Sequence, residues 1–141
     1  MGAEFNGPKE FRTVMDRIFT MMSEDPEMGP RLRDADVPQR FEFGDVDMVV
    51  NIRAAASGED GCLHWQWDDE IDWKPKVKMS MSSETANKYF QGKENVAVAI
   101  ARRRIKTSGD VKAALALIPI TKPVYAQYRE VVKAEYPHLV V

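Results

Sequence analysis

The feature that most constrains this chain is a change in the spacing of its hydrophobic residues after about residue 45. Before that point they recur at helical spacing, on one face made by Phe11, Val14, Met15, Ile18, Phe19 and Met22. Such a stripe is typical of a helix that faces a core. Between Val46 and Arg53 apolar and polar residues alternate, which is the period of a half-buried strand. We therefore expect helices packed against a sheet.

Two further segments alternate in the same way, at 63–68 and 76–81. A cluster of turn residues at 57–61 precedes the first of them, so it is expected to pair with the strand at 46–53 as an antiparallel hairpin. Residues 24–36 are acidic and poorly periodic, and we expect a loop or a short helix there.

The second half of the chain is predicted to hold mostly helices. Ser82 and Asn95 have side chains suited to helix N-caps, and Gly92 suits the end of the first short helix. The later elements are expected at 103–107 (strand), 111–118 (helix) and 124–132 (helix), with Pro119 and Pro123 interrupting the last two. The predicted fold class is α+β, with an antiparallel or mixed sheet of about four to five strands and helices packed on one side.

Length and composition indicate one domain. The chain has 141 residues, so we expect a single domain with residues 1–8 as a flexible arm and 120–141 as a C-terminal helical extension. Residues 1–72 hold 17 acidic and 7 basic side chains, whereas residues 73–141 hold 5 and 13. This balance argues against a uniformly basic nucleic-acid-binding protein. A single cysteine, Cys62, and no visible signal peptide or membrane-spanning run favour the cytoplasm.

The sequence carries none of the familiar catalytic or metal-binding motifs. There is no glycine-rich nucleotide loop, Cys-x-x-Cys pair or His-Glu-x-x-His helix, so we predict no catalytic residue, no metal site and no cofactor. Cys62 and His64 share a strand face, but no orienting third group is indicated. The acidic residues at 68–72 lack the ligand spacing of a calcium loop, and we interpret them as a solvated turn.

Four features follow one another between residues 76 and 118. They are a strand ending in Met79 to Ser83, a short helix ending in Gly92-Lys93, the segment Arg104-Ile105-Lys106 leading to Gly109-Asp110, and an aliphatic helix from Val111 to Ile118. In order and spacing they resemble the lipid-binding domain of the sterol carrier protein 2 (SCP2) family. The earlier helix and hairpin extend the resemblance to residues 10–118. The chain departs from the family at Arg103, where glycine is usual, and at Ile100-Ala101, where an aromatic residue is common.

The resemblance implies an apolar tunnel between sheet and helices that binds a sterol, fatty acid or fatty acyl-CoA and transfers or presents it without covalent chemistry. The residues expected to line the tunnel are Met48, Val50, Ile52, Trp65, Trp67, Val77, Met79, Met81, Phe90, Ile100, Leu115 and Tyr128. The phosphates of an acyl-CoA would need cations, for which the candidates are Lys93, Arg102, Arg103 and Arg104.

Two other functions stay open. In the first, the chain is an accessory subunit that docks, through its acidic residues 1–72, on an enzyme that handles acyl-CoA or ketones. A third reading is a small cone-shaped isomerase or hydratase that uses His64 or Asp47, although the terminal helices argue against that fold. Expected partners are the apolar ligand and a second copy or an enzyme, with at most peripheral membrane contact and no nucleic acid.

Overall fold

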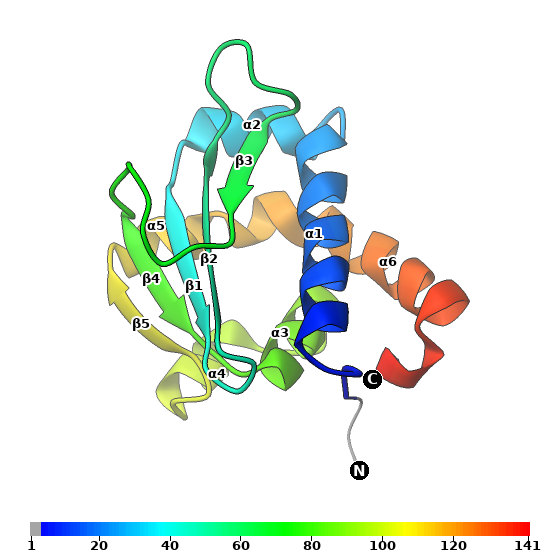
Figure 1. The fold of residues 1–141 in the computed structure, drawn as a ribbon. Helices are drawn as coiled ribbons and strands as arrows, with labels where there is room; N and C mark the ends of the chain where they lie inside the picture. The colour runs from blue at the N-terminus through cyan, green and yellow to red at the C-terminus, as the bar shows by residue number, and fades with distance from the viewer. Residues whose placement is uncertain (1–3) are drawn as a thin grey trace.

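A single five-stranded sheet organises the chain, and its helices cover one face (Figure 1). The computed structural model describes residues 4–141. Its elements are α1 (Pro8–Glu24), α2 (Met28–Ala35), β1 (Gln39–Phe43), β2 (Met48–Ala54), β3 (Leu63–Gln66), β4 (Val77–Ser80), α3 (Ser83–Phe90), α4 (Val96–Ala101), β5 (Lys106–Gly109), α5 (Val111–Ala116), α6 (Ile118–Glu135) and a 3-10 turn (Pro137–Leu139).

The strands lie in the order β3-β2-β1-β4-β5. β1 pairs antiparallel with β2 and parallel with β4, while β3 and β5 add antiparallel edges. The sheet is therefore mixed, which confirms the predicted α+β class with helices on one side. The predicted hairpin of the strands near 46–53 and 63–68 is also present, as β2 and β3.

The central strand β1 has no counterpart in the sequence prediction. Its inward residues Phe41 and Phe43 are buried, whereas Arg40 and Glu42 alternate with them and lie on the other face. The alternation covers only the five residues of QRFEF and is bounded by Pro38 and Gly44. Its pairing with strands on both sides supplies the stabilisation that so short a segment lacks alone.

Two predicted boundaries are wrong. The strand expected at 103–107 is instead β5 at Lys106–Gly109, because residues 102–105 form a turn in which the amide of Arg104 donates to the carbonyl of Ala99 at 2.9 Å. Pro119 and Pro123 do not separate two helices, since both lie within α6. Pro119 is in the first turn, where its missing N–H would have had no helical partner.

The apolar stripe of α1 packs on the sheet as predicted, and Phe11, Met15 and Ile18 have no exposed surface. On the polar border of this contact, Asp16 accepts hydrogen bonds from the indole N–H groups of Trp65 (3.0 Å) and Trp67 (2.6 Å). Two charge-assisted bonds to one carboxylate hold α1 to the edge strand β3 and to Trp67 just after it, and they fix both indoles. Within the predicted arm, residues 1–3 lie outside the described part, and Phe5 packs edge-to-face on Phe11 at 5.0 Å.

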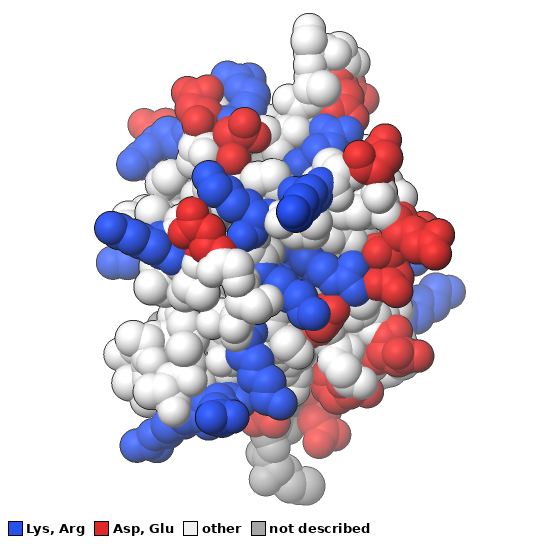
Figure 2. Space-filling view, turned by 90° about the vertical axis from the view of Figure 1, so that its left-hand side faces the viewer, with Lys and Arg blue, Asp and Glu red and all other residues white. Residues whose placement is uncertain are grey.

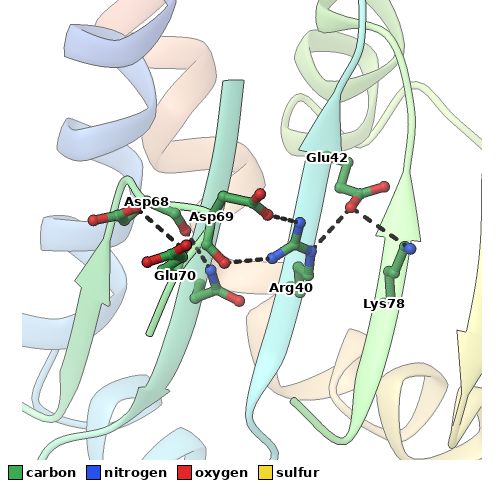
Figure 3. A network of polar contacts seen from close by, with 7 residues as sticks. Arg40, Glu42, Asp68, Asp69, Glu70 and Lys78 are labelled. Carbon is green, nitrogen blue, oxygen red and sulfur yellow. Dashed lines mark hydrogen bonds and ion pairs between the residues drawn. The ribbon is translucent and has the colours of Figure 1, made fainter. Parts of the chain in front are cut away.

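The face of the sheet away from the helices carries charged side chains that pair with one another, within a strand, across strands and with a loop (Figure 3). Arg40 on β1 binds Glu42 at 2.9 Å and also contacts the carboxylate of Asp69, and Lys78 on β4 lies 3.6 Å from Glu42. Asn51 of β2 donates to the carbonyl of Asp68 at 2.7 Å, so residues 67–76 run across this face. Part of the charge split of the sequence is thus neutralised within one sheet.

Candidate ligand-binding cavity

The helix-covered face of the sheet holds an apolar cavity. Side chains from every strand and from all six helices surround it. The lining residues are Phe19, Met22, Leu32, Val37, Gln39, Phe41, Ile52, Arg53, Ala54, Leu63, Met79, Tyr89, Phe90, Val96, Ile100, Thr107, Val111, Ala114, Leu115, Leu117, Ile118 and Thr121. Most are hydrophobic, with a few polar groups, which is the usual composition of a site for an apolar small molecule.

The cavity is narrow in this structure. Its volume is about 50 Å³, measured as the space open to the centre of a water molecule. One such centre needs roughly 10–15 Å³, so the space suits a few waters and not a sterol or an acyl chain. Met22 and Met79 on its wall are unbranched and change rotamer readily. A bulky ligand therefore has to push lining side chains aside.

No charged side chain among residues 4–141 projects into the cavity. Arg53 is the one charged residue of the lining, and its guanidinium lies on the opposite sheet face, 4.9 Å from the ring centre of Trp73. There it binds both carboxylate oxygens of Glu59, at 2.7 and 3.1 Å. This hydrogen bonding by Arg53, helped by the backbone amide of Ala56, lowers the pKa of Glu59 to about 2. The cavity interior is consequently suited to uncharged groups.

The twelve residues predicted to bind ligand fall into two groups. Five of them line the cavity, and they are Ile52, Met79, Phe90, Ile100 and Leu115. The other seven, Met48, Val50, Trp65, Trp67, Val77, Met81 and Tyr128, do not. Among these, Val50 and Val77 are buried in the packed core beside it, with at most 2% of their surface exposed. The two tryptophans instead lie against α1 and Asp16.

Tyr128 on α6 has a structural partner. Its hydroxyl donates a 2.7 Å hydrogen bond to Oδ1 of Asn87, which also accepts one from Gln91. The amide groups of Asn87 and Gln91 both donate to the carbonyl of Leu139, at 2.9 and 2.7 Å. Burial raises the pKa of the Tyr128 hydroxyl well above its usual value. The network ties α3 to α6 and to the C-terminal turn.

Several lining residues were not among the predicted ligand-binding set. Phe19 and Met22 belong to the α1 stripe, whose spacing indicates a core face but cannot tell a filled core from a cavity wall. Phe41 lies on the unpredicted strand β1. The small residues Ala114 and Thr107 also belong to the wall.

The four candidate cations lie outside the cavity wall. Arg104 is bound to Glu94 at 2.8 Å. Lys93, Arg102 and Arg103 are exposed around α4, and within residues 4–141 no carboxylate lies within ion-pair distance of them. They are therefore available to an anion at the protein surface.

The remaining candidates for chemistry are dispersed. His64 lies 3.3 Å from Glu59, and its ring packs on that of Trp73. Cys62 is beside Arg33, with 3.9 Å between Sγ and Nη1. Within the described chain, no three His, Cys, Asp or Glu side chains are grouped closely enough to hold a metal ion. The described residues also contain no helix long and apolar enough to cross a membrane.

The mixed sheet, with its helices on one face and an apolar cavity between the two layers, defines the chain as a small α+β domain. The sequence pattern of the SCP-2 sterol transfer family matches residues 29–122, more than half of the chain. The chain therefore belongs to the SCP-2 sterol transfer family. A comparison with curated proteins finds no match.

Solved structures share the fold at low sequence identity. A UbiJ-SCP2 ubiquinone synthesis protein aligns with a TM-score of 0.60 and 9% identity over 86% of this chain and 95% of its own. Sterol carrier protein 2 from Yarrowia lipolytica, in its apo form, aligns with a TM-score of 0.57 and 14% identity over 89% of this chain and 98% of its own. The sec-alkylsulfatase Pisa1 from a Pseudomonas species aligns with a TM-score of 0.60 and 17% identity over 75% of this chain. The aligned chain spans only 16% of the length of the sulfatase.

Proposed function

We propose that this protein binds an apolar ligand in the cavity between sheet and helices and transfers or presents it without covalent chemistry. The observation that carries the proposal is a cavity with an apolar wall, into which no charged side chain of residues 4–141 projects. Family membership supports lipid binding and transfer in general. A sterol, a fatty acid and a fatty acyl-CoA are the candidate ligands, with any charged head group left at the surface.

Burial of the ligand is sufficient to drive binding. Each CH₂ group removed from water contributes about 0.8 kcal/mol, so a long acyl chain offsets the cost of moving side chains such as Met22 and Met79. For an acyl-CoA, the exposed Lys93, Arg102 and Arg103 would meet the phosphates, with Arg104 released from Glu94. The proposal requires no cofactor and no catalytic residue.

We further propose that residues 1–141 act as one domain in the cytoplasm. The predicted extension at 120–141 belongs largely to α6, whose residues Ile118 and Thr121 line the cavity. In this proposal α6 closes one side of the ligand site.

Native mass spectrometry of the protein purified without added lipid tests the function, followed by titration with a fluorescent fatty acid. We expect a co-purified apolar molecule, or uptake of the probe with one molecule per chain. A protein that neither carries nor takes up an apolar molecule, whether fatty acid, acyl-CoA or sterol, would contradict the proposal.

A further inference from the structure

Three side chains that carry hydroxyl groups meet at the wall of the apolar cavity. Tyr89 on α3 and Thr121 on α6 belong to the wall, and Tyr125 lies one helical turn further along α6. The rings of Tyr89 and Tyr125 pack edge to face, with 6.1 Å between their centres. The hydroxyl of Tyr89 has those of Tyr125 and Thr121 as its side-chain hydrogen-bonding partners. We call these three residues the hydroxyl cluster.

The end of α3 allows the close approach that forms the cluster. Gly92 follows this helix with a φ angle of +73°, a conformation that glycine adopts without strain. A Cβ atom at this position would lie only 3.1 Å from a ring carbon of Tyr125. Arg129, one turn beyond Tyr125, donates to the carbonyl of Gln91 at 2.6 Å and does not line the cavity. The contact between α3 and α6 therefore holds Tyr125 beside Tyr89.

The hydroxyl cluster is uncharged at neutral pH. Burial raises the pKa of Tyr89 well above its usual value and also raises the pKa of Tyr125. The hydroxyl of Thr121 donates to the carbonyl of Ile118 at 3.2 Å, so that its oxygen acts as an acceptor towards other groups. Each hydroxyl supplies one donor and two acceptor positions. The cluster therefore offers both donors and acceptors to a ligand without bringing a charge into the cavity.

Charged side chains lie on the outer surface instead. Figure 2 shows Lys, Arg, Asp and Glu side chains over the side of the molecule where Figure 1 places β4 and β5, and Lys78 and Lys106 are exposed on these strands. An ionised carboxylate inside the cavity would have no cation beside it among residues 4–141, and burying an unpaired charge is costly. A buried hydroxyl or ketone oxygen loses far less, because the hydroxyl cluster replaces its hydrogen bonds to water.

We propose that the hydroxyl cluster is a head-group subsite of the cavity, and that it selects apolar ligands whose polar group is an uncharged alcohol or ketone oxygen. A ketone oxygen accepts from a tyrosine hydroxyl, and an alcohol also donates to the oxygen of Thr121. An ionised fatty acid has to leave its carboxylate at the surface and gains nothing from the cluster. The inference rests on the proposed ligand-binding function and deepens it, since that function leaves the head group undefined.

The test is displacement of a fluorescent apolar dye from the full chain at neutral pH by dodecanol, dodecanone, dodecane and dodecanoate, which have carbon chains of equal length. The double substitution Tyr89→Phe with Thr121→Val should weaken binding of the alcohol and the ketone at least about tenfold, because their oxygen loses its partners. Dodecane has no oxygen and should bind this variant like the wild type. The matched control, Tyr136→Phe, removes a tyrosine hydroxyl outside the cavity wall and should leave all four affinities unchanged.

Three results would overturn the subsite: undiminished binding of dodecanol and dodecanone by the double variant, an equal loss of dodecane binding in that variant, or a wild type that binds dodecanoate as tightly as dodecanol. Tyr89→Phe alone should give a smaller loss for the alcohol and the ketone, with dodecane binding again unchanged. Binding of dodecane separates this inference from the proposed function, because it depends on the apolar wall and not on the cluster. Failure of the wild type to bind the dye or any of the four ligands would instead contradict the function itself.

Discussion

The hydroxyl of Tyr128 donates a 2.7 Å hydrogen bond to Oδ1 of Asn87 in the fully buried contact between α6 and α3. Both side chains have no exposed surface, and Asn87 in turn donates to the carbonyl of Leu139. A buried polar network that is fully satisfied specifies one arrangement of its elements, because any shift leaves a group without a partner. The role of Tyr128 is thus to position α6, the helix that contributes Ile118 and Thr121 to the cavity.

Tyr128→Phe should lower the free energy of unfolding by about 1 kcal/mol, since Asn87 retains Gln91 as a donor. Asn87→Ala should cost about 3 kcal/mol, because it leaves the Tyr128 hydroxyl buried without an acceptor and also creates a cavity. Urea denaturation measures both values. Tyr136→Phe is the control and should be nearly neutral. Equal effects of the first two substitutions would show that the network does not centre on Asn87.

Thr107 and Ser108 of β5 allow a test of the cavity with a matched control. Thr107 belongs to the cavity wall, whereas its neighbour Ser108 is exposed and pairs with Lys78 on the other face. Thr107→Phe should fill the space and weaken binding of a fluorescent fatty acid at least about tenfold. Ser108→Phe should leave the affinity unchanged. Equal affinities of the two variants would place the binding site elsewhere.

Much of the fold follows from the spacing of apolar residues. The α1 stripe and the alternation around Val50 and Met79 predict a helix against a sheet, because these periods assign a buried face. The strand β1 escapes prediction because Phe41 and Phe43 are only two inward positions, and the strand exists through its pairing with β2 and β4. The residues of β1 alone do not indicate that pairing.

The cavity wall is harder to predict than the fold. Alternation places both Val50 and Ile52 on the inward face of β2, but only Ile52 reaches the cavity while Val50 packs in the filled core. Which inward residue meets empty space depends on the sizes of the side chains opposite, such as Ala114, and so on tertiary packing. Trp65 and Trp67 are also inward by pattern, yet Asp16 holds their indoles against α1.

The ion pair between Arg53 and Glu59 should make stability depend on acid pH. The pKa of Glu59 falls from an ordinary 4.5 to about 2 in the folded chain. As the pH is lowered, the Glu59 carboxylate therefore takes up a proton at a higher pH in the unfolded chain than in the folded chain. The stabilisation is therefore complete above about pH 5 and is lost as the pH falls towards about 2. Measured by urea denaturation across this range, the wild type should exceed Glu59→Gln in stability at pH 6 and approach it near pH 2. A constant difference between the two would contradict the assigned pKa.

Arg103 provides a prediction in the opposite direction, a substitution that stabilises. Its φ of +61° costs a side-chain-bearing residue about 1–2 kcal/mol, which Arg103→Gly removes, although glycine gains entropy in the unfolded chain. The net gain in unfolding free energy should be about 0.5–1 kcal/mol. Arg104→Gly is the control and should destabilise, because Arg104 does not have a positive φ and is bound to Glu94 at 2.8 Å. Thermal and urea unfolding distinguish the two, and a loss of stability in Arg103→Gly would mean that its side chain, not its backbone, dominates the energy of this turn.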